Sequence, residues 1–437
     1  MQIATIIYGI SPSTDMFLSS SYNTGNNIFA CTNGKEYYKE IEAISLHDLE
    51  QLDDKMIDRI VICSEFVSDI LKSLFDIGIK QDKCFFFNHM SETLIPCSQL
   101  SIPSASSENT LFAFYDLGCN LPCYDVTTFL VLAEQERKNQ RKQYIKFIIV
   151  PDRSEKQSGI NVYHSHHDTK WRIEKIIKPI FSTVPSYIAT DELISKKEID
   201  LYKKFQPSIF PTGYFENQRA RACDLALLKH YKESKIDISS ISAPPKAREL
   251  VLDYIRHHAG QKRVITITLR EYWANPDHRN SQLEEWANFI LSLDRDIYWP
   301  VIIRDTYKCT QPLPKSFSGI ESFPVASIDL HMRFALYQQA HINLGVENGP
   351  IYPISFMKGV RSIVFRRQSE NIPCLSSRTN EIYSFKVGKN HYFYDNDFQV
   401  TAWCDDICEN ILNEFYTLEK KITLEESNIK QEDVYER

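Results

Sequence analysis

The stretch HINLGVENGPIYPISFMKG, residues 341–359, joins a segment with strand periodicity to a helix-like segment. Its first part carries apolar residues at alternate positions, as a buried strand does: Ile342, Leu344 and Val346. The helix-like run begins at Ile351, and an acid, an amide and a Gly-Pro pair, residues 347–350, lie between the two segments. Ligands of open α/β sheets bind outside the carboxyl ends of the strands. We therefore expect a ligand site at this junction.

The alternation of strand and helix continues on both sides of this stretch, from residue 246 to residue 437. The predicted strands are 263–269, 298–304, 341–346 and 360–365. The predicted helices are 282–293, 327–340, 349–357 and a last helix at about 397–420, beyond which we expect the chain to fray. Strands that alternate with helices in this way form right-handed crossovers, so the pattern predicts a doubly wound parallel sheet.

A second α/β region precedes this one. Its predicted strands are 111–117 and 144–152, and its predicted helices are 125–140, 171–184, 189–205 and 220–231. A Ser- and Pro-rich stretch at 97–110 marks where it begins, and the Pro pair at 244–245 marks where it ends. We therefore predict three α/β domains: a small Rossmann-like domain at 1–105 and two further Rossmann-like domains at 106–245 and 246–437.

The amino-terminal region is predicted to be a small α/β domain. Residues 58–87, DRIVICSEFVSDILKSLFDIGIKQDKCFFF, contain a strand, an amphipathic helix and a second strand. This stretch resembles the terminal βαβ unit of the Rossmann-like domains that precede bacterial sugar-modifying enzymes. A dinucleotide site needs a Gly-rich turn after the first strand, and the segment that follows strand 2–8 offers only Gly9.

Composition narrows the class of protein. A chain of 437 residues with 43% hydrophobic residues can bury large cores, which indicates a folded globular protein. The net charge of -7, with acids and bases interspersed, argues against a nucleic-acid partner. The eleven cysteines show no CxxC pairs and no neighbouring His cluster, which predicts reduced thiols rather than a zinc site.

The charge and hydropathy pattern also bears on location. No apolar run reaches the length of about 18 residues that a transmembrane helix needs, and no basic segment precedes the short apolar run at residues 2–8, so we expect a cytoplasmic protein. Peripheral contact with the inner membrane stays open, because it needs only one exposed patch. The basic stretch 136–146 is either a solvated helix end or a docking patch for anionic lipid or a charged saccharide.

Charged or amide residues follow three successive predicted strands of the carboxy-terminal region. Arg270 and Glu271 follow the first, Arg304 and Asp305 the second, and residues 347–350 the third. Because carboxyl ends of parallel strands meet at one edge of the sheet, we expect these side chains to share a rim. The alternative is that each Arg pairs with a neighbouring acid and that Asn348 only caps the next helix.

The residue types at this rim fit a nucleotide. Gly349 allows a close approach of the backbone, Pro350 suits a first helical turn, and the free N–H groups of that turn favour an anion. Glu347 repels phosphate, so we expect it to accept hydrogen bonds from a ribose diol or a base edge. Arg270 and Arg304 are the residues predicted to neutralise phosphates.

A group-transfer reaction also needs a base, and two acids follow the first strand of the middle region. Asp116 is the first candidate and Asp125 the second, with turn formation and helix capping as the alternative roles. The stretch NVYHSHHDTKWR, residues 161–172, offers a rival through its histidines. No DxD-like pair follows a strand, so we expect no metal and no other cofactor, and assign stabilisation of the leaving group to Arg270 and the N-terminus of the helix that follows residues 347–350.

Two stretches resemble the GT-B class of glycosyltransferases. ITITLREYWANPDHRN, residues 265–280, resembles the strand and Arg loop of the fucosyltransferase-like branch, with Thr268 where that branch has His. GVENGPIYPISFM, residues 345–357, resembles the nucleotide-contacting turn of bacterial GT-B enzymes. The resemblance implies two Rossmann-like domains in GT-B arrangement, a terminal helix that crosses between them, and the diphosphate on Arg270.

The function implied by this resemblance is an inverting, metal-independent transfer of a sugar from a nucleotide-sugar donor to a saccharide or lipid-linked acceptor. The implied setting is bacterial surface-polysaccharide assembly. Hydrolysis or epimerisation of a nucleotide sugar is the alternative activity, and a non-catalytic nucleotide-sugar-binding protein is the alternative class.

Overall fold

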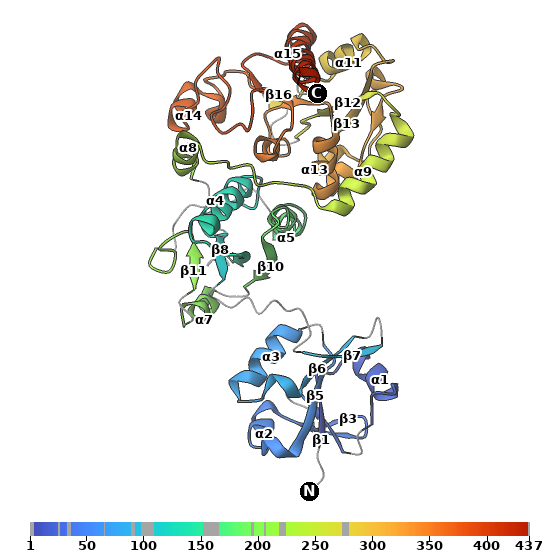
Figure 1. The fold of residues 1–437 in the computed structure, drawn as a ribbon, viewed down its shortest axis with the longest axis vertical. Helices are drawn as coiled ribbons and strands as arrows, with labels where there is room; N and C mark the ends of the chain where they lie inside the picture. Colours follow the sequence, from blue (N-terminus) through green and yellow to red (C-terminus); the bar gives the residue numbers. More distant parts are fainter. Residues whose placement is uncertain are drawn as a thin grey trace. The chain divides into compact units, whose positions relative to one another are not determined.

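The computed structural model describes residues 4–435 with ten internal gaps: 25–26, 33–35, 65, 89–91, 98–108, 152–165, 194–195, 205–206, 218–223 and 273–278. The chain separates into two compact units, Met1–Ser106 and Ser107–Arg437 (Figure 1). None of the described helices is both long and apolar enough to span a membrane.

The first unit is built on one seven-stranded sheet in the order β3-β4-β2-β1-β5-β6-β7. Its strands are β1 Ala4–Tyr8, β2 Ile28–Cys31, β3 Tyr37–Tyr38, β4 Ile41–Ile44, β5 Ile57–Ile62, β6 Cys84–Asn88 and β7 Thr93–Pro96. Its helices are α1 Pro12–Ser19, α2 Leu46–Glu50 and α3 Val67–Asp76. The strand β1 pairs in parallel with β2 on one side and β5 on the other, so the order of the strands reverses there.

The place where the strand order reverses is filled by the unit's own residues. Gly9 has a φ of +93°, and a Cβ at this position would come 2.9 Å from the Cβ of Ser64. The hydroxyl of Ser11 donates to the carbonyl of Cys63 at 2.6 Å. The loops after β1 and β5 are therefore bonded to each other at the point where a dinucleotide would need room.

The second unit contains two parallel sheets. The four-stranded sheet has the order β10-β9-β8-β11, with β8 Thr110–Asp116, β9 Tyr144–Val150, β10 Tyr187–Glu192 and β11 Ser208–Phe210. Its helices are α4 Val126–Asn139, α5 His166–Arg172, a π-helical turn Ile173–Ile177, α6 Lys178–Phe181, α7 Ile199–Lys204 and α8 Leu225–Glu233.

The six-stranded sheet has the order β14-β13-β12-β15-β16-β17. Its strands are β12 Arg263–Thr268, β13 Tyr298–Ile303, β14 Glu321–Ser322, β15 Ile342–Val346, β16 Ser362–Phe365 and β17 Gln399–Ala402. The helices around it are α9 Pro245–His258, α11 Leu283–Ser292, α12 Val325–Ile328, α13 Leu330–Gln339, α14 Ser377–Ile382 and α15 Cys408–Tyr435. These parallel sheets confirm the predicted α/β fold class.

One continuous core holds the two sheets of the second unit together. It contains Phe129 of α4 and Phe147 of β9 as well as Val301 of β13 and Phe334 of α13. Residues 126–135 of α4 are all buried, as expected of a helix that is covered on every side. The hydroxyls of Thr128 and Tyr352 also bond across the interface at 2.7 Å. A separate core on the other face of the six-stranded sheet packs α11 and α15.

Two predicted helices are different elements in the structure. The range 189–205 begins as the end of β10 and only then forms α7, because Tyr187–Glu192 extends the four-stranded sheet beside β9. The range 349–357 is a five-residue 3₁₀ turn, Tyr352–Phe356, with Pro353 inside it. A turn this short lacks the aligned N–H groups and the dipole that were expected to bind an anion.

The last predicted helix also differs from the structure. Residues 399–402 form the edge strand β17, and α15 begins only at Cys408 but continues to Tyr435 instead of fraying near 420. No Gly or Pro interrupts the sequence 408–435, which explains the added length. The described apolar contacts of α15 lie on the six-stranded sheet, at Ile411, Phe415, Leu418 and Ile422, so this part of the helix does not cross to the other sheet.

Candidate functional site

The carboxyl ends of three neighbouring strands, β12, β15 and β16, face the four-stranded sheet across a cleft. The cleft has a volume of about 1180 Å³. Four of the predicted site residues line it: Asp125 from the four-stranded sheet, and Glu347, Asn348 and Gly349 from the six-stranded one. Its volume is large enough for a nucleotide sugar together with part of an acceptor.

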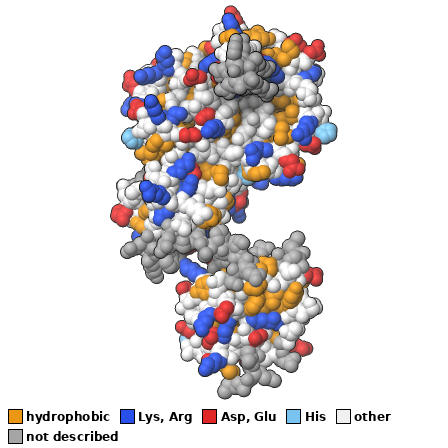
Figure 2. Space-filling view, viewed as in Figure 1, with side chains coloured by type: hydrophobic (Ala, Val, Ile, Leu, Met, Phe, Trp, Pro, Cys, Tyr) orange, Lys and Arg blue, Asp and Glu red, His pale blue; other side chains and the backbone are white. Residues whose placement is uncertain are grey.

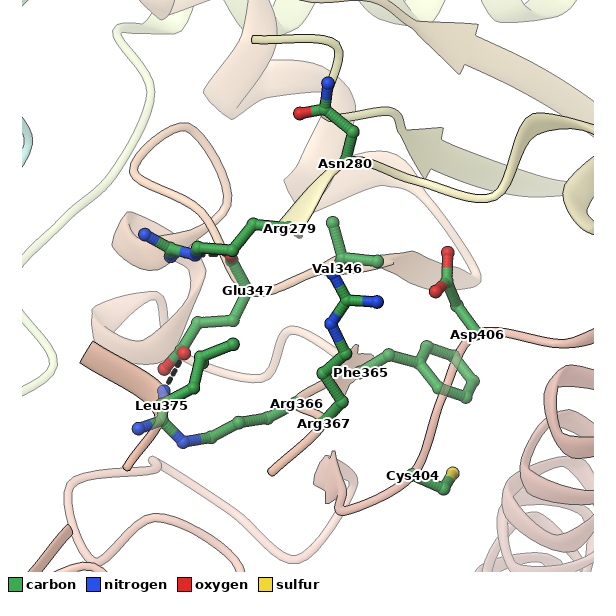
Figure 3. A pocket seen from close by; sticks show the side chains of 10 residues that line it. All are labelled: Arg279, Asn280, Val346, Glu347, Phe365, Arg366, Arg367, Leu375, Cys404 and Asp406. Atoms are coloured by element: carbon green, nitrogen blue, oxygen red, sulfur yellow. Dashed lines mark hydrogen bonds and ion pairs between the residues drawn. The ribbon is translucent and has the colours of Figure 1, made fainter. Parts of the chain in front are cut away.

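Glu347 is the first residue after β15, and its carboxylate forms an ion pair with Nη1 of Arg366, which follows the neighbouring strand β16. The Nε2 atom of His391 lies 3.7 Å from the other carboxylate oxygen. The backbone carbonyl of Glu347 accepts a hydrogen bond from Nη2 of Arg279 at 3.3 Å. Figure 3 shows Glu347 between Arg279 and Arg366, with Arg367 beside Val346.

Asn348 is buried, and its two side-chain atoms behave differently. The Oδ1 atom accepts a hydrogen bond from the backbone N–H of Ile351 at 3.0 Å, which fixes the turn. The Nδ2 atom is buried and has no hydrogen-bond partner among the described residues. An unsatisfied buried donor costs free energy, and Asn348 itself lines the cleft.

Gly349 is the contact point between the two sheets. A Cβ at this position would come 2.7 Å from a ring carbon of Tyr124, which belongs to the loop before α4. Only glycine lets the two loops meet at this separation. The carbonyl of Pro350, the next residue, accepts a hydrogen bond from the Tyr337 hydroxyl at 3.4 Å, and Thr268 bonds the same hydroxyl at 2.9 Å. The turn is therefore held from both sheets.

Arg270 comes just after β12 and keeps a cationic group near this rim. Its Nη1 atom donates to Asn280 at 2.7 Å, and its guanidinium lies 5.4 Å from the ring centre of Tyr272. Burial lowers the pKa of Arg270, and the nearby Arg279 lowers it further. Residues 273–278 of the same loop, which belong to the predicted Arg-loop motif, lie outside the described residues.

Arg304 differs from the expectation that it faces a phosphate. Its side chain is buried, and it binds both carboxylate oxygens of Glu271 at 2.8 and 2.5 Å. Its Nη1 atom donates to the carbonyls of Gln311 and Pro312 at 2.9 and 3.0 Å. The protein itself therefore occupies this guanidinium. This agrees with the alternative stated from the sequence, in which each Arg pairs with a neighbouring acid.

Three arginines of the site were not among the predicted residues. Arg366 and Arg367 directly follow β16, and Arg279 comes from the loop after β12. All three line a small cavity of about 20 Å³ that shares Arg279, Glu347 and Arg366 with the cleft. Burial lowers the pKa of Arg366 to about 10, and Arg279 contributes in the same direction. The Arg-Arg pair after the predicted strand 360–365 was a sequence signal for Arg366 and Arg367.

The two candidate bases lie in different environments. The Asp116 carboxylate is almost fully buried, with Nζ of Lys196 2.8 Å from both of its oxygens and the hydroxyl of Tyr214 at 2.7 Å. It also accepts the backbone N–H of Gly118 at 2.8 Å. These contacts give Asp116 a structural role in shaping the loop after β8 and leave it no open lone pair toward the cleft.

Asp125 precedes α4 at the capping position but makes no capping hydrogen bond with its side chain. The residue is exposed where it lines the cleft. Desolvation raises the pKa of the Asp125 carboxyl, while a hydrogen bond with the Cys123 thiol acts in the opposite direction. A carboxylate with a raised pKa that lines a cleft has the properties of a general base.

The histidines proposed as a rival base do not form a described cluster. Residues 161–165 lie outside the described residues, and so does the side chain of His166. Asp168 pairs with Arg172 at 3.0 Å, within its own helix. In the described part of the chain, no group of three or more His, Cys, Asp or Glu side chains is arranged to hold a metal ion.

Comparisons with known proteins give only distant likenesses. No family model and no curated protein matches the chain. Among solved structures, a glycosyl transferase family 9 protein from Veillonella parvula has 11% sequence identity and a TM-score of 0.44, and the match covers 71% of this chain and 97% of that one. The E. coli ADP-heptose LPS heptosyltransferase II has 7% identity and a TM-score of 0.41, over 72% of this chain and 99% of that one. Because both TM-scores are below 0.5, these likenesses establish neither the fold nor the activity of this chain.

Proposed function

We propose that this protein is a glycosyltransferase that moves a sugar from a nucleotide-sugar donor to a saccharide acceptor. One observation carries the proposal. Four arginines gather at the ends of β12 and β16 and in the loop after β12: Arg270, Arg279, Arg366 and Arg367. Of these, only Arg366 forms an ion pair with a described carboxylate.

Burial lowers the pKa of Arg270 and Arg366, and the charge of Arg279 lowers both further, so these cations are in an unfavourable arrangement until an anion joins them. A diphosphate has the matching charge and spacing of oxygens, and guanidinium groups bind it with charge-assisted hydrogen bonds. Glu347 lies among these cations and, beside the phosphates, fits the hydroxyls of a ribose. Asn348, which also lines the cleft, would contact the donor substrate beside Glu347.

The reaction that fits this cleft is a single displacement with inversion at the donor sugar. Asp125 lies on the opposite wall from the arginines and would take the proton from the acceptor hydroxyl as that oxygen attacks the sugar carbon. Arg270 and Arg279 would stabilise the charge on the departing nucleoside diphosphate, next to Arg366, whose guanidinium is held by Glu347, Cys374 and Asn380. Arginines suffice for this stabilisation, so we propose a metal-independent reaction. We place it in the assembly of a bacterial surface polysaccharide, on a saccharide or lipid-linked acceptor.

Calorimetric titration with a panel of nucleoside diphosphates tests this proposal first. We expect one of them to bind, and Arg279→Ala and Arg270→Ala to weaken it by roughly 10- to 150-fold, the effect of one charge-assisted hydrogen bond. Arg256→Ala, an exposed arginine on α9, is the matched control and should bind normally. Failure of every nucleotide to bind the native protein would remove the proposal.

Product analysis with the bound nucleotide's sugar derivatives then identifies the reaction. Sugar transfer only in the presence of an acceptor supports a transferase. Rapid sugar release or isomerisation without acceptor would assign a hydrolase or an epimerase to the same cleft. Binding without turnover, unchanged in Asp125→Asn, would assign a nucleotide-sugar-binding protein.

A further inference from the structure

Positively charged side chains form a band along one side of the second unit, outside the cleft. We define this basic band by six exposed residues: Lys138, Arg141, Lys235, Arg378, Lys386 and Lys389. Figure 2 shows blue side chains gathered over the α14 and α8 region and toward α4. None of the six forms an ion pair with a described carboxylate. All six charges lie at the surface, where Lys138 also lies close enough to the Asp237 carboxylate to help lower its pKa.

Hydrogen bonds hold the three segments of the basic band side by side. Asn139, at the end of α4, donates to the hydroxyl of Tyr231 on α8 at 3.2 Å. The hydroxyl of Tyr392, from the loop that follows α14, donates to the carbonyl of Leu225 on α8 at 3.1 Å. The band thus continues from the four-stranded-sheet side to the six-stranded-sheet side.

Three large apolar side chains project from the same surface, within and just after α14. Ile382 is 66% exposed, Tyr383 41% and Val387 59%. Single exposed apolar residues are normal in proteins, but three within six positions, next to Lys386 and Lys389, form a mixed cationic and apolar surface.

This apolar exposure does not result from a loosely packed loop. Phe385, between the exposed residues, points inward, with its ring centre 4.2 Å from that of His391 and 5.4 Å from the guanidinium of Arg366. Two reverse turns with left-handed residues, Ser384 and Gly388, shape the segment. The loop therefore presents Ile382 and Val387 outward on a fixed support.

We propose that the basic band and the apolar residues Ile382, Tyr383 and Val387 together dock the protein on an anionic lipid bilayer. Lysines and arginines near such a surface are attracted to its phosphate groups, and apolar side chains of this size enter the boundary between head groups and acyl chains. The chain as a whole carries a charge of -7, so attraction to an anionic surface has to come from a local patch such as this one.

The position of this surface suits an acceptor carried on a lipid. Ile382 and Tyr383 also line the cleft, so the docking surface borders the opening through which an acceptor would enter. This last step rests on the proposed function, whereas the docking itself does not. Lipid binding and nucleotide binding can therefore fail independently of each other.

Co-sedimentation with vesicles tests the docking surface. We expect the protein to bind vesicles of phosphatidylcholine mixed with phosphatidylglycerol, to release them as salt is raised, and to bind pure phosphatidylcholine much more weakly. Lys386→Gln with Lys389→Gln should lower the partition coefficient by roughly 30-fold, since each cation contributes about fivefold. Ile382→Ser with Val387→Ser should lower it by roughly tenfold.

The matched control substitutes one exposed cation and one exposed apolar residue elsewhere, Arg256→Gln with Leu291→Ser. It should stay within about twofold of the native protein, because neither residue belongs to the surface. An equal loss in this control, equal binding to both vesicle types, or no binding at low salt would overturn the proposal. A change of oligomeric state in the Ile382/Val387 variant, with vesicle binding unchanged, would instead make the surface an interface between copies. Nucleotide binding by the Lys386→Gln/Lys389→Gln variant and by the control, measured in parallel, should equal that of the native protein, because none of these four residues lines the cleft.

Discussion

The carboxylate of Glu347 and the guanidinium of Arg366 form an ion pair that joins the ends of the neighbouring strands β15 and β16 at the cleft. Arg366 is almost fully buried, whereas Glu347 stays about a quarter exposed. The Nε atom of Arg366 has no hydrogen-bond partner among the described residues. The pair therefore fixes the orientation of both side chains, while part of the Glu347 carboxylate stays open to a ligand.

Glu347→Gln should destabilise the protein and weaken nucleotide binding. Removal of the carboxylate leaves the buried Arg366 charge without its ion-pair partner, which costs about 3 kcal/mol in pairs of this kind. We expect a lower urea midpoint with an unchanged slope, and a loss of nucleotide affinity in calorimetry. Glu249→Gln breaks an exposed pair with Lys246 and should change the free energy of unfolding by less than about 0.5 kcal/mol. Equal stability of Glu347→Gln and the native protein would show that the ion pair contributes little.

Asp125→Asn should separate catalysis from folding. Loss of a general base typically lowers the rate by roughly 10²- to 10⁴-fold, whereas nucleotide affinity should stay unchanged because the amide keeps the shape of the acid. The folded pKa of Asp125 is raised, so its charged form opposes folding above that pKa, and the amide should leave stability equal or higher.

The pH profile gives a second readout for Asp125. A base must be deprotonated, so the native rate should fall as pH drops through a pKa above the ordinary aspartate value, and this limb should vanish from the residual activity of Asp125→Asn. A full rate in the variant, or an unchanged acid limb, would assign the proton transfer to another group.

Asp116→Asn should behave in the opposite way to Asp125→Asn. It leaves the Lys196 ammonium next to a neutral amide in a buried site, and the loss of one partner of a buried pair costs about 3–5 kcal/mol. We expect a clear fall in melting temperature by calorimetry, with activity lost only in proportion to the folded fraction. A stable Asp116→Asn protein without activity would restore Asp116 as the catalytic candidate.

Most of the fold could be predicted, because the spacing of apolar residues along the chain indicates which side chains are buried. The strands β8, β12, β13 and β15 are apolar throughout or at alternate positions, and each was placed within a residue or two. The prediction of a helix at 349–357 was wrong because the apolar spacing of this range also fits a 3₁₀ turn, and Pro353 prevents a longer helix. The edge strands β10 and β17 are short, and their sequences match helical spacing equally well.

The position of the site could be predicted from the sequence, but not the identity of every residue in it. The rule that ligands lie at the carboxyl ends of strands located Glu347 and Asn348, which line the cleft. The same rule could not distinguish Arg304, which turns back to Glu271, from Arg366, which lines the cleft, because that choice depends on partners far away in the sequence. Asp116 and Asp125 are similar in sequence terms, and their environments differ through partners far away in the sequence: Lys196 and Tyr214 lie 80 and 98 residues from Asp116.

Gly349→Ala should disturb the contact between the two sheets. The added methyl group would lie 2.7 Å from the Tyr124 ring, so one of the two loops has to move, and forced packing of this kind costs about 1–3 kcal/mol. We expect lower stability by urea unfolding and slower sugar transfer. The double variant with Tyr124→Ala removes the obstacle, so Gly349→Ala should cost much less in that background. A double-mutant cycle without coupling between the two positions would show that the contact is not close in solution.

Glu419 should make stability depend on pH in the acid range. Its carboxylate accepts hydrogen bonds from Arg263 and Tyr298 at 2.7 and 2.6 Å and lies 2.7 Å from His341, which fixes α15 against β12 and β13. Burial opposes the charge, but these hydrogen bonds outweigh it and lower the pKa of Glu419 to about 2. A depressed folded pKa stabilises the protein above the unfolded value of about 4.3, and this stabilisation is lost as pH falls toward 2.

We expect Glu419→Gln to lower the free energy of unfolding at neutral pH by about 3 kcal/mol and to flatten its decline between pH 5 and 2, measured by urea titration at each pH. The control is Glu426→Gln. Glu426 lies on the same helix as Glu419 and forms a more exposed ion pair with Arg361, so this substitution should leave the decline of stability with falling pH unchanged. Parallel pH profiles for Glu419→Gln and the native protein would show that Glu419 titrates alike in the folded and unfolded chain.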